Sequence, residues 1–192
     1  MSWIPELKLG LWNAWILMLY YPLHPVIMIL IDKVVGTGDM FKKMGDVPYE
    51  RGEKGAFIVA MIIILVMVIY SIFLPLKIGT TWLYIGLLIY LVGLAMVMVA
   101  IVNIATTPLG HPFVDGIYQY SRHPMMFFSF ITFLGVSLVT TSWVFLLLSI
   151  VVMVLQVVQA IAEERGCLEM FGDRYHEYLD STPRWIGIPK SS

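Results

Sequence analysis

The stretch PMMFFSFITFLGVSLVTTSWVFLLLSIVVMVLQVVQAIA, residues 124–162, decides the fold, because it contains no charged side chain. A helix needs about 20 apolar residues to cross the hydrocarbon core of a bilayer. The stretch is too long for one span, and it predicts two helices joined by a tight turn at Thr140, Thr141 and Ser142. A helical hairpin also pairs backbone groups that an irregular chain would leave unsatisfied in lipid.

Three further stretches without charge have the length of a membrane span: residues 9–31, 56–74 and 78–102. We therefore predict an all-α integral membrane protein with five transmembrane helices and a cytoplasmic C-terminal helix, forming a single domain over residues 1–192. Pro22 and Pro25 each lack a backbone donor and obstruct the preceding turn. We expect the first span to be kinked or broken there.

Composition supports a membrane protein and excludes several functional classes. Of the 192 residues, 59% are hydrophobic and 13% are charged, and the net charge of −1 argues against a nucleic-acid partner. The single cysteine, Cys167, cannot form an intramolecular disulfide and fits a reducing cytoplasmic side. The four histidines show no metal-ligand spacing, so we expect no metal site.

Lysine and arginine are distributed unequally between the loops. If the N-terminus lies outside, the inner side holds Lys33, Lys42, Lys43, Arg51, Lys54, Arg122, Arg165, Arg174, Arg184 and Lys190. The outer side then holds Lys8 and Lys77. Because cytoplasmic loops carry an excess of Lys and Arg, this pattern predicts an N-out, C-in topology with five spans.

Two polar segments flank the apolar hairpin. The first polar segment, residues 118–124, reads Tyr-Gln-Tyr-Ser-Arg-His-Pro, and the second polar segment, residues 163–185, begins with two glutamates. Ionisable side chains are costly at a bilayer edge, so such clusters are candidates for a functional site. The predicted topology places both segments at the cytoplasmic face. The glycine-rich loop of residues 32–55 is expected to be irregular, in part helical, and able to fold over this site.

Gln156, Gln159 and Glu163 recur at helical spacing and form one stripe on the last span, rising about 10 Å over seven residues. The stripe suits a polar ligand entering from the inner face, although glutamines also form hydrogen bonds between membrane helices. Glu163 and the adjacent Glu164 point about 100° apart on a helix. We expect Glu163 to face the site and Glu164 to cap a turn or to pair with a cation such as Arg122.

Arg122, His123 and Pro124 open the fourth span. Proline suits the first helical turn, where free N–H groups favour an anion, and the guanidinium of Arg122 matches a carboxylate. Alternatively, Arg122 is an interfacial anchor. Asn103, near the end of the third span, either binds a ligand or satisfies the frayed helix end.

The ordered set Gly116-Ile117-Tyr118, Ser121-Arg122-His123-Pro124, Glu163-Glu164, Phe171-Gly172-X-X-Tyr175-X-X-Tyr178 and Pro183-Arg184 covers about the C-terminal half of the chain. This set resembles the isoprenylcysteine carboxyl methyltransferase and phospholipid methyltransferase superfamily of integral membrane enzymes. The chain looks most similar to compact prokaryotic-type relatives of the isoprenylcysteine enzyme.

The resemblance implies that S-adenosylmethionine binds at the cytoplasmic ends of the last three helices, within residues of about 100–192, and leaves as S-adenosylhomocysteine. The implied cofactor contacts are Asn103, Gly110, His111, Pro112, Phe113, Tyr118, His123, Pro124, Met125, Met126 and Glu163. Gln159, with Gln156 on the same stripe, would face a lipophilic acceptor that arrives from the bilayer. Arg122, Glu163 and Glu164 are the candidate catalytic residues.

The acceptor stays open between two chemistries. A prenylcysteine-like carboxylate is favoured and needs no general base, whereas a phospholipid amine must lose a proton, for which Glu163 or Glu164 is the candidate base. A third alternative is an NADPH-dependent sterol-type reductase, because Glu164-X-X-Cys167 is similar to an acidic-X-X-Cys element of those enzymes. Such an enzyme needs cations for the 2′-phosphate, and few lie near the site.

Overall fold

The computed structural model describes residues 6–45 and 47–189, and within them it contains helices and no strand. The elements are α1 (Trp15–Met18), α2 (Tyr20–Val34), α3 (Met40–Met44), α4 (Arg51–Ser71), α5 (Thr81–Thr106), the 3₁₀ helix η1 (Gly116–Gln119), α6 (Pro124–Thr140), α7 (Trp143–Phe171) and α8 (Asp173–Ser181). Lys190, counted above among the inner cations, lies outside the described residues.

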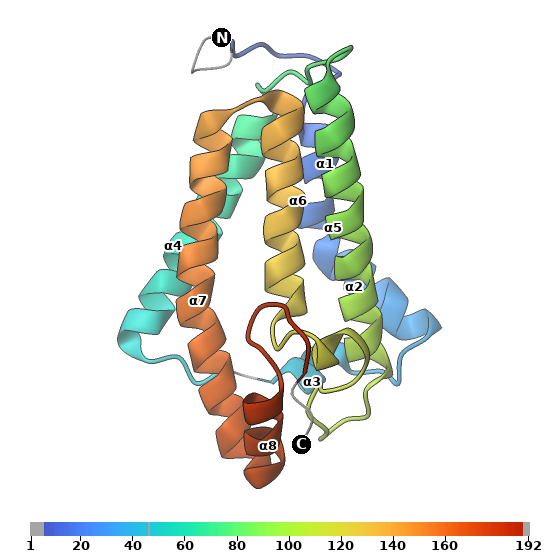
Figure 1. Ribbon diagram of the computed structural model, residues 1–192, viewed down its shortest axis with the longest axis vertical. Coiled ribbons are helices and arrows are strands. Elements are labelled where there is room, and N and C mark those ends of the chain that lie inside the picture. Colours follow the sequence, from blue (N-terminus) through green and yellow to red (C-terminus); the bar gives the residue numbers. More distant parts are fainter. Residues whose placement is uncertain (1–5, 46, 190–192) are drawn as a thin grey trace.

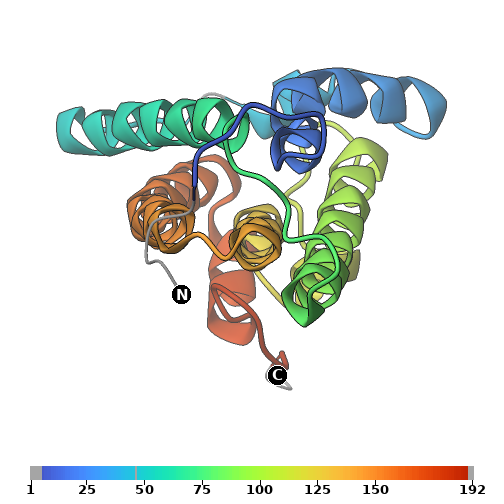
Figure 2. The ribbon, with the colours of Figure 1, turned by 90° about the horizontal axis from the view of Figure 1, so that it is seen from above.

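Four of these helical segments are long and apolar enough to cross a membrane: Trp15–Val34, Arg51–Ser71, Thr81–Thr106 and Trp143–Phe171. The shorter apolar helix α6 has 17 residues and lies between α5 and α7 (Figures 1 and 2). Many large apolar side chains point outward, including Leu65, Leu88 and Leu147. Outward apolar side chains on long helices are typical of a surface in contact with lipid, so the chain is a membrane protein.

The hairpin between α6 and α7 turns where the sequence predicts it. Thr141 adopts the left-handed conformation, with φ of 51°, and reverses the chain. The hydroxyl of Ser142 then accepts a hydrogen bond from the backbone N–H of Phe145 at 3.2 Å and caps the start of α7. The cap satisfies one of the free N–H groups at the helix end.

The first span is broken at Leu19, between α1 and α2. Pro22 then falls in the first turn of α2, where the missing N–H is tolerated, while Pro25 lies inside that helix. In an unbroken helix, the ring of Pro22 would collide with the carbonyl of Met18. The prediction of a broken first span therefore holds, with the break slightly before the proline.

Helices α5 and α6 are in close contact because glycines on each helix face the backbone of the other helix. A Cβ atom added at Gly135 would lie 2.6 Å from the backbone nitrogen of Tyr90, and one at Gly93 would lie 2.8 Å from that of Thr132. Only a residue without a side chain permits this approach of two backbones. The contact fixes the start of α6, and with it the first polar segment, against the end of α5.

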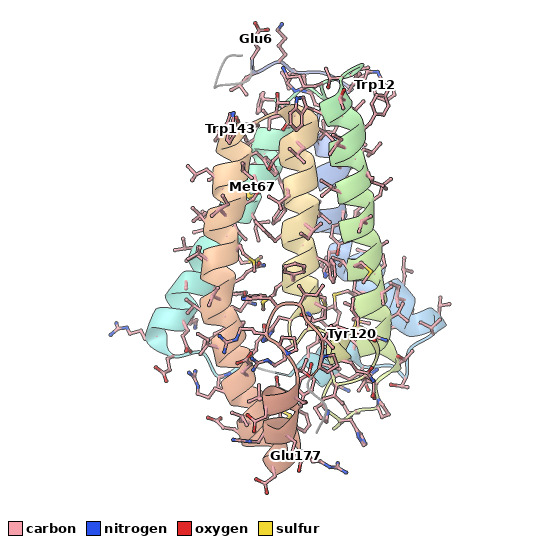
Figure 3. All side chains as sticks on the ribbon, in the orientation of Figure 1. Glu6, Trp12, Met67, Tyr120, Trp143 and Glu177 are labelled. Atoms are coloured by element: carbon pink, nitrogen blue, oxygen red, sulfur yellow. The ribbon has the colours of Figure 1, made fainter. Side chains whose placement is uncertain are left out.

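The two ends of the bundle differ in chemistry. At the end that carries α3 and α8, helices α2 and α4 diverge, as Figures 1 and 2 show. The opposite end holds exposed Trp12 and Trp143, labelled in Figure 3, which are side chains typical of a membrane interface. Of the described lysines and arginines, Lys8 and Lys77 lie at this tryptophan end and the remainder lie at the α8 end.

Candidate active site

Backbone hydrogen bonds join the two polar segments at the α8 end. The N–H of Arg122 donates to the carbonyl of Pro183 at 3.0 Å, and that of His123 donates to the carbonyl of Arg184 at 3.3 Å. The buried hydroxyl of Tyr178 donates to the carbonyl of Tyr118 at 2.7 Å. Residues that are about 60 positions apart in the sequence therefore form one rigid unit.

Glu164 is the centre of a buried ionic cluster. Its two carboxylate oxygens accept hydrogen bonds from Arg184, from Nε at 2.9 Å and from Nη2 at 2.7 Å. Nη1 of Arg122 lies 3.1 Å from Oε1, and Nε2 of His123 lies at the same distance. A buried carboxylate is tolerated when cations and donors surround it in this way. The cluster explains how an ionised glutamate persists at this depth.

His123 bridges the two adjacent glutamates. Its Nδ1 lies 3.3 Å from Oε2 of Glu163, and its Nε2 contacts Glu164. Burial by itself would lower the pKa of His123, but the two carboxylates outweigh burial and raise the pKa above its ordinary value. The imidazole therefore favours the charged form, in which both ring nitrogens donate.

Asn103 holds the loop before α6 in place. Its side-chain oxygen accepts a hydrogen bond from the backbone N–H of Ile117 at 3.0 Å. Gly116 has φ of 62°, and a Cβ atom there would lie 2.5 Å from that oxygen, so only glycine fits. Through this contact Asn103 orients η1 and the buried ring of Tyr118.

A cavity of about 550 Å³ opens beside the ionic cluster. Eleven of the predicted site residues line it: His111, Pro112, Phe113, Tyr118, Arg122, His123, Met125, Met126, Gln156, Gln159 and Glu163. Four do not: Asn103, Gly110, Pro124 and Glu164. Glu163 and Glu164 thus divide as expected from their helical angle, one on the cavity wall and one in the ionic cluster behind it.

The polar stripe of α7 runs along the cavity wall. The amide nitrogen of Gln159 donates to Glu163 at 3.2 Å, while the side-chain oxygen of Gln156 is buried and has no hydrogen-bond partner among the described residues. Across the cavity, burial and the nearby carboxylate of Glu163 raise the pKa of Tyr49 to about 12. The stripe therefore presents one carboxylate and an unpaired amide oxygen to a ligand.

The matched family agrees with the resemblance seen in the motifs. Residues 80–174, about half of the chain, match the phospholipid methyltransferase family. The chain belongs to the isoprenylcysteine and phospholipid methyltransferase superfamily. It is thus a membrane methyltransferase, and all of its predicted site residues lie within the matched segment. No curated protein matches the chain.

The cavity of this methyltransferase has a second wall that the motifs do not predict. It comes from outside the matched segment and includes Tyr20, Tyr21, His24, Lys43, Tyr49, Phe57, Met61 and Ile64. The loop of residues 32–55 supplies Lys43 and Tyr49, in keeping with its expected place over the site. The one signal in α2 was Tyr20 and His24, four residues apart in an apolar span, since polar side chains inside a span are seldom incidental.

Two basic side chains, Arg165 and Lys43, hold this second wall against the rest of the methyltransferase. Arg165 on α7 donates to both carboxylate oxygens of Glu53, at 2.8 and 2.7 Å, and to the carbonyl of Pro48 at 2.8 Å. The buried ammonium of Lys43 donates to the carbonyl of Ala105 at 2.6 Å and lies 3.7 Å from Asp32. These contacts fix residues 43–45 and 47–53 along one side of the cavity.

Proposed function

We propose that this chain transfers a methyl group from S-adenosylmethionine to a lipophilic acceptor inside the cavity. The observation that carries the proposal is the meeting of Glu163, Arg122 and the rings of Phe113 and Tyr118 on one cavity wall within the family segment. The cavity volume of about 550 Å³ is in the range of small-molecule sites.

The side chains on the wall fit the groups of the cofactor. Glu163 offers a carboxylate for its amino group or ribose hydroxyls. The Nε atom of Arg122 is buried without a hydrogen-bond partner among the described residues, and it suits the cofactor's carboxylate. Phe113 and Tyr118, with ring centroids 5.9 Å apart, supply faces for the adenine or the sulfonium.

The other proposed cofactor residues complete or shape this wall. His111, Pro112, His123, Met125 and Met126 line the cavity. In this proposal, Asn103, Gly110, Pro124 and Glu164 act indirectly, because they set the loop, the start of α6 and the position of His123 and Arg122.

When bound, the cofactor supplies a methyl group on an electrophilic sulfonium. The protein then needs to align the acceptor in line with that group and to exclude water, which can account for most of the rate acceleration. Gln159, fixed by its hydrogen bond to Glu163, is placed to orient the acceptor. The mainly apolar walls from α4 and α6 exclude water around it.

We favour a prenylcysteine-like carboxylate as the acceptor, since a carboxylate needs no base and Glu163 is already bound to His123 and Gln159. The match to the phospholipid methyltransferase family supports a second candidate, the amine of a phospholipid. In that reaction Glu163 is the cavity-facing group that would accept the proton.

We also propose that α6 is a fifth span and that the α8 end faces the cytoplasm. At 1.5 Å per residue, the 17 residues of α6 extend about 26 Å, close to the thickness of the hydrocarbon core. The concentration of lysine and arginine at the α8 end supports the N-out, C-in orientation.

Calorimetric titration of the detergent-purified protein tests the proposed function. S-adenosylhomocysteine and NADPH are titrated separately. Saturable binding of S-adenosylhomocysteine alone is expected, and its loss in Glu163→Gln would assign that binding to the cavity. Binding of NADPH alone would overturn the proposal in favour of a reductase, and binding of neither would remove its cofactor.

A further inference from the structure

The cavity lining includes four polar side chains without formal charge that the proposed cofactor contacts do not use. Here Tyr20 and His24 of α2 lie among the lining residues with Ser129 of α6 and Gln156 of α7. All four lie within apolar helices. Polar groups placed in apolar helices and open to a cavity suggest a ligand that pairs with them.

Tyr20 orients the ring of His24. The hydroxyl of Tyr20, a largely buried residue, forms a hydrogen bond with Nδ1 of His24, and the two rings meet edge to face with centroids 5.2 Å apart. A phenol donates readily to an unprotonated imidazole nitrogen, which places the remaining proton on Nε2. Nε2 has no hydrogen-bond partner among the described residues, so His24 offers a free donor to the cavity.

Gln156 offers the complementary group. Its side-chain oxygen is buried and has no partner among the described residues. A buried acceptor without a donor is costly, so the site is complete only when a ligand supplies one. Gln156 lies one helical turn from Gln159, a rise of about 5 Å, so the group it binds is close to the proposed reaction centre.

We propose that His24 and Gln156 recognise a neutral secondary amide of the acceptor, next to the atom that is methylated. The amide carbonyl accepts from Nε2 of His24, and the amide N–H donates to the side-chain oxygen of Gln156. This inference rests on the proposed function, because it assigns the acceptor of that same cavity. Tyr20, His24, Ser129 and Gln156 supply neither an ammonium nor a guanidinium group, so a charged phosphate group finds no such cation among them.

His24 and Tyr20 lie outside the segment that matches the family, whereas Gln156 lies within it. The proposed amide-binding site therefore combines one side chain from the matched segment with two from the part of the chain outside it. We therefore expect residues of α2 to determine which acceptor the enzyme prefers.

Two probes that differ in the amide alone test this inference. N-acetyl-S-farnesylcysteine carries a carboxylate and an adjacent amide, and S-farnesylthiopropionate carries the same carboxylate and chain without the amide. Methyl transfer is measured for wild type, His24→Phe, Tyr20→Phe and Gln156→Leu. Tyr84→Phe, which removes a hydroxyl from the exposed face of α5, serves as control.

Wild type and Tyr84→Phe should prefer the amide probe in kcat/KM by about tenfold, the worth of one or two hydrogen bonds. Each of the other three variants should lower that preference by about fivefold or more, with unchanged S-adenosylhomocysteine affinity. The same preference in folded His24→Phe and Gln156→Leu would overturn the inference, as would transfer to neither probe while S-adenosylhomocysteine binds. Absence of S-adenosylhomocysteine binding in wild type would instead overturn the proposed function.

Discussion

The guanidinium of Arg184 and the carboxylate of Glu164 form a bidentate ion pair, with Nε to Oε1 at 2.9 Å and Nη2 to Oε2 at 2.7 Å. This pair connects the segment after α8 to the charged C-terminal part of α7. It also leaves Glu164 without a free oxygen for catalysis, because Arg122 and His123 share Oε1. We therefore assign Glu164 a positioning role behind the cavity wall.

Replacement of Glu164 by glutamine should destabilise the protein. The substitution leaves Arg122, His123 and Arg184 facing a neutral amide, and breaking a buried ion pair costs about 3 kcal/mol. A thermal unfolding midpoint lower by about 6 °C or more is expected in detergent.

Arg184→Lys is the matched variant for this pair, since it retains the positive charge and removes the bidentate hydrogen bonding. Its midpoint should lie between those of wild type and Glu164→Gln. Equal midpoints for wild type and Glu164→Gln would show that the ionic cluster does not hold the two polar segments together.

Replacement of Glu163 should weaken cofactor binding and leave stability almost unchanged. Glu163 is partly exposed on the cavity wall, with its side chain 29% accessible, so Glu163→Gln should leave the unfolding midpoint within about 2 °C of wild type. S-adenosylhomocysteine affinity should fall by about tenfold or more, as a charged hydrogen bond is lost. Arg122→Ala is expected to lose cofactor use in the same way, and wild-type transfer rates in either folded variant would contradict the site.

The hairpin and one wall of the site could be predicted because their signals are local. Residues 124–162 lack any charge over nearly twice the length of a span, which leaves a helical hairpin as the solution for lipid. Gln156, Gln159 and Glu163 share a helical face wherever α7 lies. Glu163 and Glu164 are neighbours on a helix and therefore point about 100° apart. Their different environments could be predicted from this angle.

The second wall could not be predicted, because it depends on how the helices pack. Phe57 and Met61 are ordinary apolar residues of a span, and nothing in their neighbours indicates that α4 turns them toward α7. Lys43 lies in a loop rich in charge, yet its ammonium is buried against the end of α5. Such contacts join residues far apart in the sequence and leave no local pattern.

Stability should depend on pH through His123. Glu163 and Glu164 raise its pKa in the folded protein, so the charged imidazole stabilises the fold. This stabilisation is complete below the ordinary histidine pKa of about 6.5 and is lost as the pH rises through the raised value. The midpoint of wild type should therefore exceed that of His123→Gln by more at about pH 6 than at about pH 9.

His176→Gln is the control for this pH series, because His176 forms an exposed ion pair with Asp180. Its difference from wild type should stay small at both pH values, since exposed pairs contribute little. A gap between wild type and His123→Gln that widened toward alkaline pH would reverse the assigned sign.

The contact between Arg165 and Glu53 should restrain the loop beside the cavity. Glu53→Gln weakens the ion pair and leaves residues 47–53 less tightly held. Hydrogen exchange in this segment should become about fivefold faster. Lys54→Gln, an exposed neighbour, should leave exchange unchanged. Equal exchange in wild type and Glu53→Gln would show that Arg165 does not restrain the loop.

The glycine contact between α5 and α6 predicts that replacing glycine by alanine lowers stability at Gly135 but not at Gly52. A Cβ atom at Gly135 meets the backbone of Tyr90 at 2.6 Å, so Gly135→Ala must separate the helices, at about 1–3 kcal/mol. At Gly52, in the first turn of α4, a Cβ atom has no neighbour within 4 Å, and alanine favours the helix by up to about 1 kcal/mol. Thermal unfolding should therefore show a lower midpoint for Gly135→Ala and an equal or higher one for Gly52→Ala. A midpoint for Gly135→Ala at or above that of Gly52→Ala would mean that the α5–α6 backbones are not in contact there.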